Sequence, residues 1–337
     1  MGSVIPLKKS ANSAYLDLKN LMGKKLSDVE SLIEQKLQSE VGLIKKMSTH
    51  HLKSGGKRLR ALLTLGSAKL SGYELGERDI NLAACVELIH SATLLHDDVI
   101  DESTLRRGIK TINSIWGNQS SILVGDYLLS RCFEIMVDDG DLEILKLLSS
   151  TSAKIAQGEV LQLQHKGEAD LLEETYINII SLKTAALFSA ATKTGACLAG
   201  SNIKEKNALE SYGKNLGLAF QIADDALDYY AKEKLFGKEI GKDFFEGKAT
   251  LPLIIIFQKG NDEERSFLLE ILKKEKRNED DFSETLALIN KYKAVEASLK
   301  RAEYFVNVSY DALGIFQDSE DKKILQNLTG FSLNRSF

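Results

Sequence analysis

The chain has 337 residues, of which 43% are hydrophobic and 27% are charged, a composition that fits a soluble globular protein and excludes a disordered or fibrous one. Its formal net charge of −4 does not suggest a nucleic-acid-binding protein, which would usually carry a basic excess. Only two prolines occur, Pro6 and Pro252, although average usage would give about 17. Because helix interiors exclude proline, this scarcity favours an all-helical protein.

The elements expected from the N-terminus onward are helices. Apolar residues step by three and four over 18–33, a loop-like Ser-Gly-Gly cluster follows at 54–56, and a helix is predicted at about 59–70. The next helix, at about 79–101, is apolar on most faces, which is typical of a buried helix. The segment at about 262–300 is more charged and predicts solvated amphipathic helices.

Nothing in the sequence divides the chain into parts. We find no internal repeat, no convincing strand alternation and no linker rich in Pro, Gly or Ser. We therefore expect a single helical domain over residues 1–337, of which the first ~10 residues would be mobile.

Cysteine usage and apolar runs indicate the compartment. Cys85, Cys132 and Cys197 form no Cys-x-x-Cys pair, which argues against a disulfide framework or a zinc site and favours the reducing cytoplasm. The N-terminus lacks the long apolar core of a signal peptide. The purest apolar run, residues 251–257, is far shorter than the ~20 residues that span a bilayer, so no stable membrane insertion is expected.

Two aspartate clusters of the form DDxxD are the strongest functional signals: DDVID at 97–101 and DDALD at 224–228. On a helix, positions i and i+4 share a face, so each cluster presents two carboxylates side by side, and a cation would relieve their repulsion. One such cluster could be a solvated helix end, but two in one chain argue against that alternative. Neither has the layout of a calcium-binding EF-hand loop, so Mg²⁺ bridging to phosphate is the better interpretation.

Basic residues occur where a magnesium-bound diphosphate would need them. Arg106 and Arg107 follow the first cluster after a short loop, and GGKRLR at 55–60 places three cations where a loop meets a helix. Glycines let the backbone approach an anion, and a helix N-terminus favours one. Further Gly-Lys pairs occur within 237–248. The GGKRLR segment lacks the Walker A spacing and is not a P-loop.

Together these motifs resemble the trans-prenyltransferases, the all-helical isoprenyl diphosphate synthases, over about residues 55–252. They occur in the family's order: GGKRLR (55–60), ELIHSATLLHDDVID (87–101), RRG (106–108), GDYLLSRCF (125–133), KT (183–184), FQIADDALD (220–228), GKEIGKD (237–243) and EGKATLP (246–252). One departure is Ala61, where the family usually has proline. The resemblance implies an all-α bundle of ten or more helices around a central cavity, with the aspartate clusters facing each other across its mouth, and a homodimer.

The resemblance also implies roles for individual residues. Roughly two or three Mg²⁺ ions per active site would be held by six carboxylates: Asp97, Asp98, Asp101, Asp224, Asp225 and Asp228. The allylic diphosphate would be bound by Arg106, Lys183, Thr184, Gln221, Lys238 and Lys248. Isopentenyl diphosphate would be bound by Lys57, Arg60, His90 and Arg107. The catalytic set would be Asp97, Asp98, Asp101, Arg106, Lys183, Asp224 and Lys238.

In the implied reaction the allylic diphosphate ionises, isopentenyl diphosphate attacks the carbocation, and loss of a proton restores the alkene. The growing chain needs an apolar groove. Ala92 and its neighbours are small, and Ala92 lies about 7.5 Å below Asp97 along the helix. In the family, a bulky aromatic residue there gives short products. Phe133, seven residues after Asp126 and on the same helix face, would form a deeper floor.

We therefore expect a product of about eight isoprene units (about C40), of the quinone side-chain type. Helix packing is the alternative interpretation of Ala92, and core filling is that of Phe133. A synthase of shorter farnesyl or geranylgeranyl products is an alternative function. A regulatory prenyltransferase subunit would typically lose an aspartate cluster, and a terpene cyclase generally lacks the second DDxxD. A ferritin-like di-iron site would need a second motif like Glu87-x-x-His90, and the sequence has none.

Overall fold

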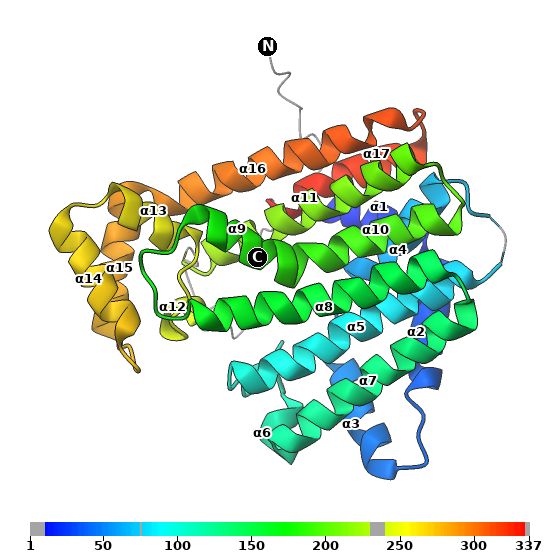
Figure 1. The fold of residues 1–337 in the computed structure, drawn as a ribbon, viewed down its shortest axis with the longest axis horizontal. Coiled ribbons are helices and arrows are strands. Elements are labelled where there is room, and N and C mark those ends of the chain that lie inside the picture. The colour runs from blue at the N-terminus through cyan, green and yellow to red at the C-terminus, as the bar shows by residue number, and fades with distance from the viewer. Residues whose placement is uncertain (1–10, 75, 230–239, 334–337) are drawn as a thin grey trace.

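The structure, a computed structural model, describes residues 11–74, 76–229 and 240–333. Two sequence-based expectations lie outside these ranges, the mobility of the N-terminal segment and the role of Lys238. Within the described ranges the predicted all-α class is confirmed, because one antiparallel pair of two-residue strands is the only sheet (Figure 1). No helix in these ranges is long and apolar enough to cross a membrane.

The elements follow one another through short loops. The first part of the chain forms α1 (Ala11–Leu21), α2 (Gly23–Lys36), α3 (Gly42–Lys53), α4 (Leu59–Leu70), α5 (Arg78–Ile100), β1 (Leu105–Arg106), β2 (Ile109–Lys110), α6 (Ile112–Trp116), α7 (Asn118–Asp139) and α8 (Leu142–Gln164). The second part forms α9 (Glu173–Ile180), the π-helix η1 (Ser181–Ala185), α10 (Ala186–Leu198), α11 (Ile203–Leu227), α12 (Lys242–Phe245), α13 (Leu251–Lys259), α14 (Asp262–Lys273), α15 (Glu279–Tyr292), α16 (Ala294–Ala312), the 3₁₀ helix η2 (Leu313–Ile315), α17 (Glu320–Leu328) and the 3₁₀ helix η3 (Thr329–Ser332).

Helix α5 lies at the centre of the first part of the chain. Its sequence is apolar on most faces, as a helix surrounded by others requires, and it packs against α2, α4, α7 and α10. The helices predicted at 59–70 and 79–101 correspond to α4 and α5. Because α5 ends at Ile100, Asp97 and Asp98 lie in its last turn and Asp101 follows as its C-cap. The first aspartate cluster therefore stands at the end of a rigid, buried helix.

Helix α11 joins two clusters of buried apolar residues. Its first half contributes Leu209, Tyr212 and Leu216 to a cluster that includes side chains of α4, α5 and α7. Its second half contributes Ile222 and Ala226 to a cluster that includes side chains of α13 and α16. The second aspartate cluster lies at the C-terminal end of α11, so its position is also fixed by core packing.

The charged segment forms amphipathic helices, as predicted. Figure 1 shows α14 and α15 at one end of the molecule, beside α13. Each begins with a capping box, in which an asparagine side chain and an acidic side chain three residues later satisfy each other's backbone N–H groups. These reciprocal hydrogen bonds explain why two highly charged segments start as helices at Asp262 and Glu279.

Candidate active site

The first aspartate cluster contains carboxylates with different environments. Asp98 is 2% exposed, and both of its oxygens accept hydrogen bonds from Arg106 of β1, at 2.7 Å from Nη2 and 3.0 and 3.2 Å from Nε. Its backbone carbonyl accepts from the Ser103 N–H and from the Asn113 amide. Asp98 therefore fixes the turn after α5 and orients Arg106.

Asp97 and Asp101 lie one turn apart beside two lysines. Burial raises the pKa of Asp97 to about 6; Lys183 opposes this shift, and the negative charges of Glu159 and Asp101 add to it. Burial also disfavours the charged form of Asp101, but the cations Lys248 and Lys183 outweigh it and hold the pKa of Asp101 below its ordinary value. These two carboxylates thus sit where an added cation would be stabilised.

The second cluster is tied to a chain of predicted substrate-binding residues. Asp225 is 5% exposed and accepts hydrogen bonds from Tyr176 Oη (2.6 Å) and Gln221 Nε2 (2.7 Å), while burial raises its pKa to about 7. Gln221 Oε1 in turn accepts from Thr184 Oγ1 at 2.8 Å. Asp228 accepts a hydrogen bond from the backbone N–H of Asp243 at 3.0 Å. Asp225 and Asp228 therefore have protein partners already.

Lys248 connects the surroundings of the two clusters. Its ammonium group lies 3.1 Å from Asp101 Oδ1 and 2.6 Å from Glu246 Oε2. The charges of Asp101 and Asp243 raise its pKa despite burial, and Asp243 is itself bonded to Asp228. Lys242 from the same segment donates to the Ser103 hydroxyl at 2.9 Å. Lys242 of α12 and Lys248 of the loop that follows thus place two cations beside the end of α5.

Lys183 and Thr184 lie in a π-helical segment, η1, where the chain inserts an extra residue into a turn. Such π-bulges are frequent at functional sites because they redirect side chains. Lys183 pairs with Glu159 and donates to Gln162 Oε1 at 2.8 Å, both on α8. Gly158 permits this approach, since a Cβ there would lie 2.6 Å from the backbone nitrogen of Lys183.

A second group of cations lies around the loop before α4. Arg107 donates to the carbonyl of Gly55, and burial together with the charges of Arg106 and Arg58 lowers its pKa. The Arg60 guanidinium lies 4.5 Å from the ring centre of Phe188, and the Lys57 ammonium lies 4.6 Å from that of Phe331. Crowded, partly buried cations repel one another, which is the condition that a bound anion would relieve.

Neutral imidazoles adjoin this basic group. Burial lowers the pKa of His90 well below its ordinary value, and the charges of Arg60 and Arg107 lower it further. His51 of α3, which the sequence did not single out, behaves in the same way, with its pKa lowered to about 3 by burial and by Arg106 and its neighbours. Both rings are therefore neutral and can donate a hydrogen bond to an anion without adding charge.

Several residues around the site were missed in the sequence. Each of them makes a hydrogen bond or an ion pair with a predicted site residue: Glu159, Gln162, Tyr176, Asp243 and Glu246. Asp243 and Glu246 do lie within the quoted motifs. Their position among lysines was the sequence feature that could have identified them. Glu159 and Gln162 are three residues apart on one face of α8, a spacing that is common in any helix.

The donor set fits magnesium that binds together with a diphosphate. Within residues 11–74, 76–229 and 240–333, no three carboxylate, imidazole or thiol groups converge closely enough to hold a metal ion by themselves. Magnesium usually takes one or two protein carboxylates and completes its octahedron with water and substrate phosphates. Asp97 and Asp101, one helical turn apart and near Lys183, supply that kind of partial ligand set.

The two predicted chain-length residues have different surroundings. Ala92 is fully buried within α5. Phe133 is 52% exposed on α7 of the single chain, and its role as the floor of an interior groove stays a prediction. The heptad spacing to Asp126 was sound, since both are exposed on one side of α7. That side faces outward because Val124, Leu128 and Cys132 fill the inward side.

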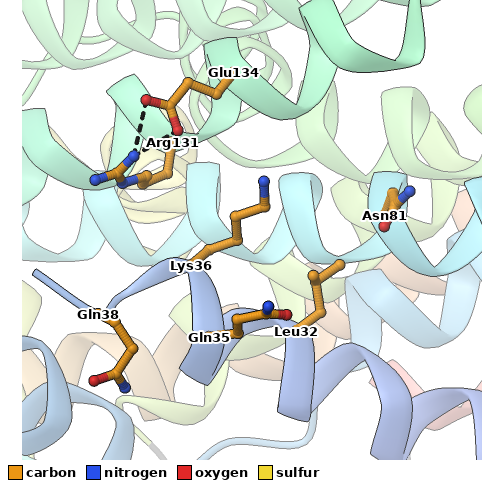
Figure 2. A pocket seen from close by; sticks show the side chains of 7 residues that line it. All are labelled: Leu32, Gln35, Lys36, Gln38, Asn81, Arg131 and Glu134. Atoms are coloured by element: carbon orange, nitrogen blue, oxygen red, sulfur yellow. Dashed lines mark hydrogen bonds and ion pairs between the residues drawn. The ribbon is translucent and has the colours of Figure 1, made fainter.

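A separate cavity has a volume of about 430 Å³. Figure 2 shows its lining side chains: Leu32, Gln35, Lys36, Gln38, Asn81, Arg131 and Glu134. It lies between α2 and α7, near the beginning of α5. Asn81 precedes Asp97 by sixteen residues, so this cavity is about 24 Å from the aspartate cluster along the helix axis. Its Arg131 is already bonded to Glu134 and to the Tyr127 hydroxyl. The cavity is not part of the candidate active site.

Known proteins that are similar to this chain identify its family. The family model for polyprenyl synthetase matches residues 41–289. The octaprenyl diphosphate synthase of Haemophilus influenzae is 35% identical over 331 residues, covering 98% of this chain and 100% of that protein. The geranylgeranyl diphosphate synthase of Sulfolobus acidocaldarius is 30% identical, covering 96% of this chain and 99% of that protein.

A solved structure is also closely similar. The polyprenyl synthase from Caulobacter crescentus, complexed with calcium and isoprenyl diphosphate, is 41% identical and superposes with a TM-score of 0.91 over 95% of this chain and 98% of that chain. The fold is therefore that of the all-helical isoprenoid synthases. The chain belongs to the polyprenyl synthetase family and is a prenyltransferase.

Proposed function

We propose that this protein is a magnesium-dependent trans-polyprenyl diphosphate synthase that condenses isopentenyl diphosphate with an allylic diphosphate. The observation that supports the proposal is the presence of two groups of charged residues with different composition. One combines the carboxylates Asp97 and Asp101 with Lys183 and Lys248. The other contains cations and neutral histidines around residues 55–60.

The first site suits the diphosphate that leaves. Asp97, Asp101 and Asp224 would hold magnesium, with Asp98, Asp225 and Asp228 in support. When bound, magnesium supplies positive charge that makes diphosphate a better leaving group. Arg106, Lys183 and Lys248 add fixed cations, with Thr184 and Gln221 as hydrogen-bonding partners. Lys238, in the same proposed set, lies outside the described residues.

The second site suits the diphosphate that stays. Lys57, Arg60 and Arg107 would bind the isopentenyl diphosphate, with the neutral ring of His90 as a further donor. Holding the two substrates at fixed, adjacent sites converts their encounter into a reaction within one complex. The allylic C–O bond breaks first, and the double bond of isopentenyl diphosphate then attacks the resulting carbocation. The departing diphosphate takes the proton that is lost. No protein nucleophile is needed.

A long product, about eight isoprene units, is supported by the small side chain of Ala92 and by the octaprenyl relative. Similarity to a geranylgeranyl diphosphate synthase supports a shorter product as the second candidate. Replacing Ala92 by Phe tests the groove. If the growing chain passes this position, Ala92→Phe will give products of farnesyl or geranylgeranyl length. Unchanged product length in a folded variant would show that Ala92 only packs between helices.

A second copy of the chain is the partner that we propose for the exposed apolar stripe on α7. Leu123 and Val137 are each 66% exposed there, and Phe133 lies between them in sequence. Burying such a patch is the usual reason for a homodimer. The dimer predicts twice the chain mass in light scattering and a monomer for Leu123→Asp. A monomeric wild-type protein would contradict it.

Three further assignments belong to the same proposal. The chain is one helical domain, because α11 contributes to both apolar clusters. It works in the cytoplasm, in keeping with three buried, free cysteines. Its product is a quinone side-chain precursor, which rests on product length alone. Fractionation of the source cells and analysis of quinones after gene deletion test the last two.

A product assay tests the reaction itself. Purified protein is incubated with labelled isopentenyl diphosphate, farnesyl diphosphate and Mg²⁺, with or without EDTA, and products are sized after phosphatase treatment. We expect a magnesium-dependent ladder that ends near C40, about eight units. A short terminal product would leave the enzyme class intact and remove the long-chain assignment. No elongation with any allylic primer would favour a regulatory subunit instead.

A further inference from the structure

Glu87 on α5 is a buried carboxylate that the proposed reaction does not use. It is 3% exposed, and its two oxygens contact different parts of the segment that carries Lys57 and Arg60. Oε1 accepts a hydrogen bond from the backbone N–H of Ala61 at 3.0 Å. Oε2 lies 3.7 Å from Nη1 of Arg58. The two oxygens of this buried carboxylate thus contact one short segment, at the Arg58 side chain and at the Ala61 backbone.

The segment needs such an outside partner because it cannot cap its own helix. Arg58 is the N-cap of α4 and lies in the left-handed region, with φ of 49°, and its side chain offers no hydrogen-bond acceptor. Ala61 is the third helical residue, whose N–H an N-cap side chain would ordinarily satisfy. Glu87 replaces that missing cap from a neighbouring helix. A proline at position 61 would have no N–H to cap.

We propose that Glu87 is a positioning residue for isopentenyl diphosphate, an inference that rests on the proposed function of Lys57 and Arg60. By holding the Ala61 N–H and the Arg58 guanidinium, it fixes the left-handed turn between those two cations. The carboxylate does not contact substrate. Its effect is to present both cations at one spacing, so its loss weakens the second diphosphate site and leaves the first unchanged.

Three substitutions separate the two contacts. Glu87→Gln keeps an oxygen for the Ala61 N–H and loses the charge opposite Arg58. Ala61→Pro removes the hydrogen bond and keeps the charge pair, and proline is tolerated in the first helical turn. Glu87→Ala removes both. Glu30→Gln is the matched control, since Glu30 also lies 3.7 Å from Arg58 but is exposed.

Steady-state kinetics with each substrate varied in turn provide the readout. We expect Glu87→Ala to raise the KM for isopentenyl diphosphate about tenfold, with the KM for the allylic diphosphate and kcat changed less than about twofold. Glu87→Gln and Ala61→Pro should each give part of that increase, and Glu30→Gln less than about twofold. If Glu87→Ala does not fold, the other two variants carry the test.

Two results would overturn the assignment. Equal increases of both KM values, or no change with a lower melting temperature, would show that Glu87 is only structural. An effect of Glu30→Gln as large as that of Glu87→Gln would assign the role to the charge around Arg58 in general. Failure of the proposed function is distinguishable, because the wild-type protein would then not elongate any primer.

Discussion

Asp97 and Asp98 are adjacent in one DDxxD motif, yet the structure predicts opposite consequences for their replacement by Asn. Asp98 makes three hydrogen bonds with Arg106 and is almost completely buried. Asp97 makes no side-chain hydrogen bond or ion pair within the described residues. Asp98→Asn should therefore damage the fold, whereas Asp97→Asn should damage only the reaction.

The loss of stability expected for Asp98→Asn depends on how exposed its partner, Arg106, is. Breaking a fully buried ion pair from one side costs about 3–5 kcal/mol, because a charge is left unpaired. Arg106 keeps 26% of its side-chain surface exposed, so water compensates in part and about 2 kcal/mol is expected for Asp98→Asn. For Asp97→Asn, the free energy of unfolding should stay the same or rise, because burial and the neighbouring carboxylates already disfavour the charged form of Asp97 in the folded protein.

Urea denaturation of the metal-free, substrate-free proteins measures the first effect, and elongation at saturating substrate measures the second. Asp97→Asn should slow elongation at least about a hundredfold, as loss of a group that stabilises developing charge usually does. The reasoning is refuted if Asp97→Asn destabilises the protein as much as Asp98→Asn does, or if Asp98→Asn leaves stability unchanged.

Three further predictions concern the supporting contacts. Gly158→Ala places a Cβ 2.6 Å from the backbone nitrogen of Lys183. We therefore expect the free energy of unfolding to fall by about 1–3 kcal/mol and elongation to slow. Elongation at the wild-type rate would mean that η1 can shift to make room for the Cβ. Lys248→Met removes the cation between Asp101 and Glu246 and should raise the KM for the allylic diphosphate only; an equal rise for isopentenyl diphosphate would contradict the two-site assignment. The hydrogen bonds from Lys291 and Tyr292 lower the pKa of Glu264 to about 2. The ionised Glu264 side chain therefore stabilises the fold above its ordinary pKa of 4.5, and this stabilisation is lost as the pH falls from 4.5 towards 2. Glu264→Gln should therefore show a shallower loss of stability than wild type over that window, and parallel curves would refute the contribution.

Periodicity and motif order were sufficient for the helical class and for the ends of α4 and α5. Both helices are bounded by local signals, a Gly-Gly loop before Leu59 and an acidic stretch after Ile100. The aspartate clusters could also be placed at helix ends, because hydrophobic runs stop there. These features are determined by residues close together in the sequence, so one sequence is enough to predict them.

The different environments of Asp97 and Asp98 could not be predicted from sequence. Adjacent helical residues point about 100° apart, and which one is buried depends on where β1 returns to α5. The same limit applies to Phe133. A seven-residue spacing puts Asp126 and Phe133 on one face, but the sequence does not say which face of α7 meets the core. Glu87 illustrates a third case, since its partners, Arg58 and Ala61, are more than twenty-five positions away.

The measurement that tests the account most directly is calorimetric binding of each diphosphate with and without metal. A non-ionisable thio-analogue of the allylic diphosphate and authentic isopentenyl diphosphate would each be titrated into the protein in Mg²⁺ and in EDTA. We predict that EDTA abolishes binding of the allylic analogue and leaves binding of isopentenyl diphosphate intact, because only the first site is built from carboxylates. Equal dependence of both ligands on metal would contradict two sites of different chemistry.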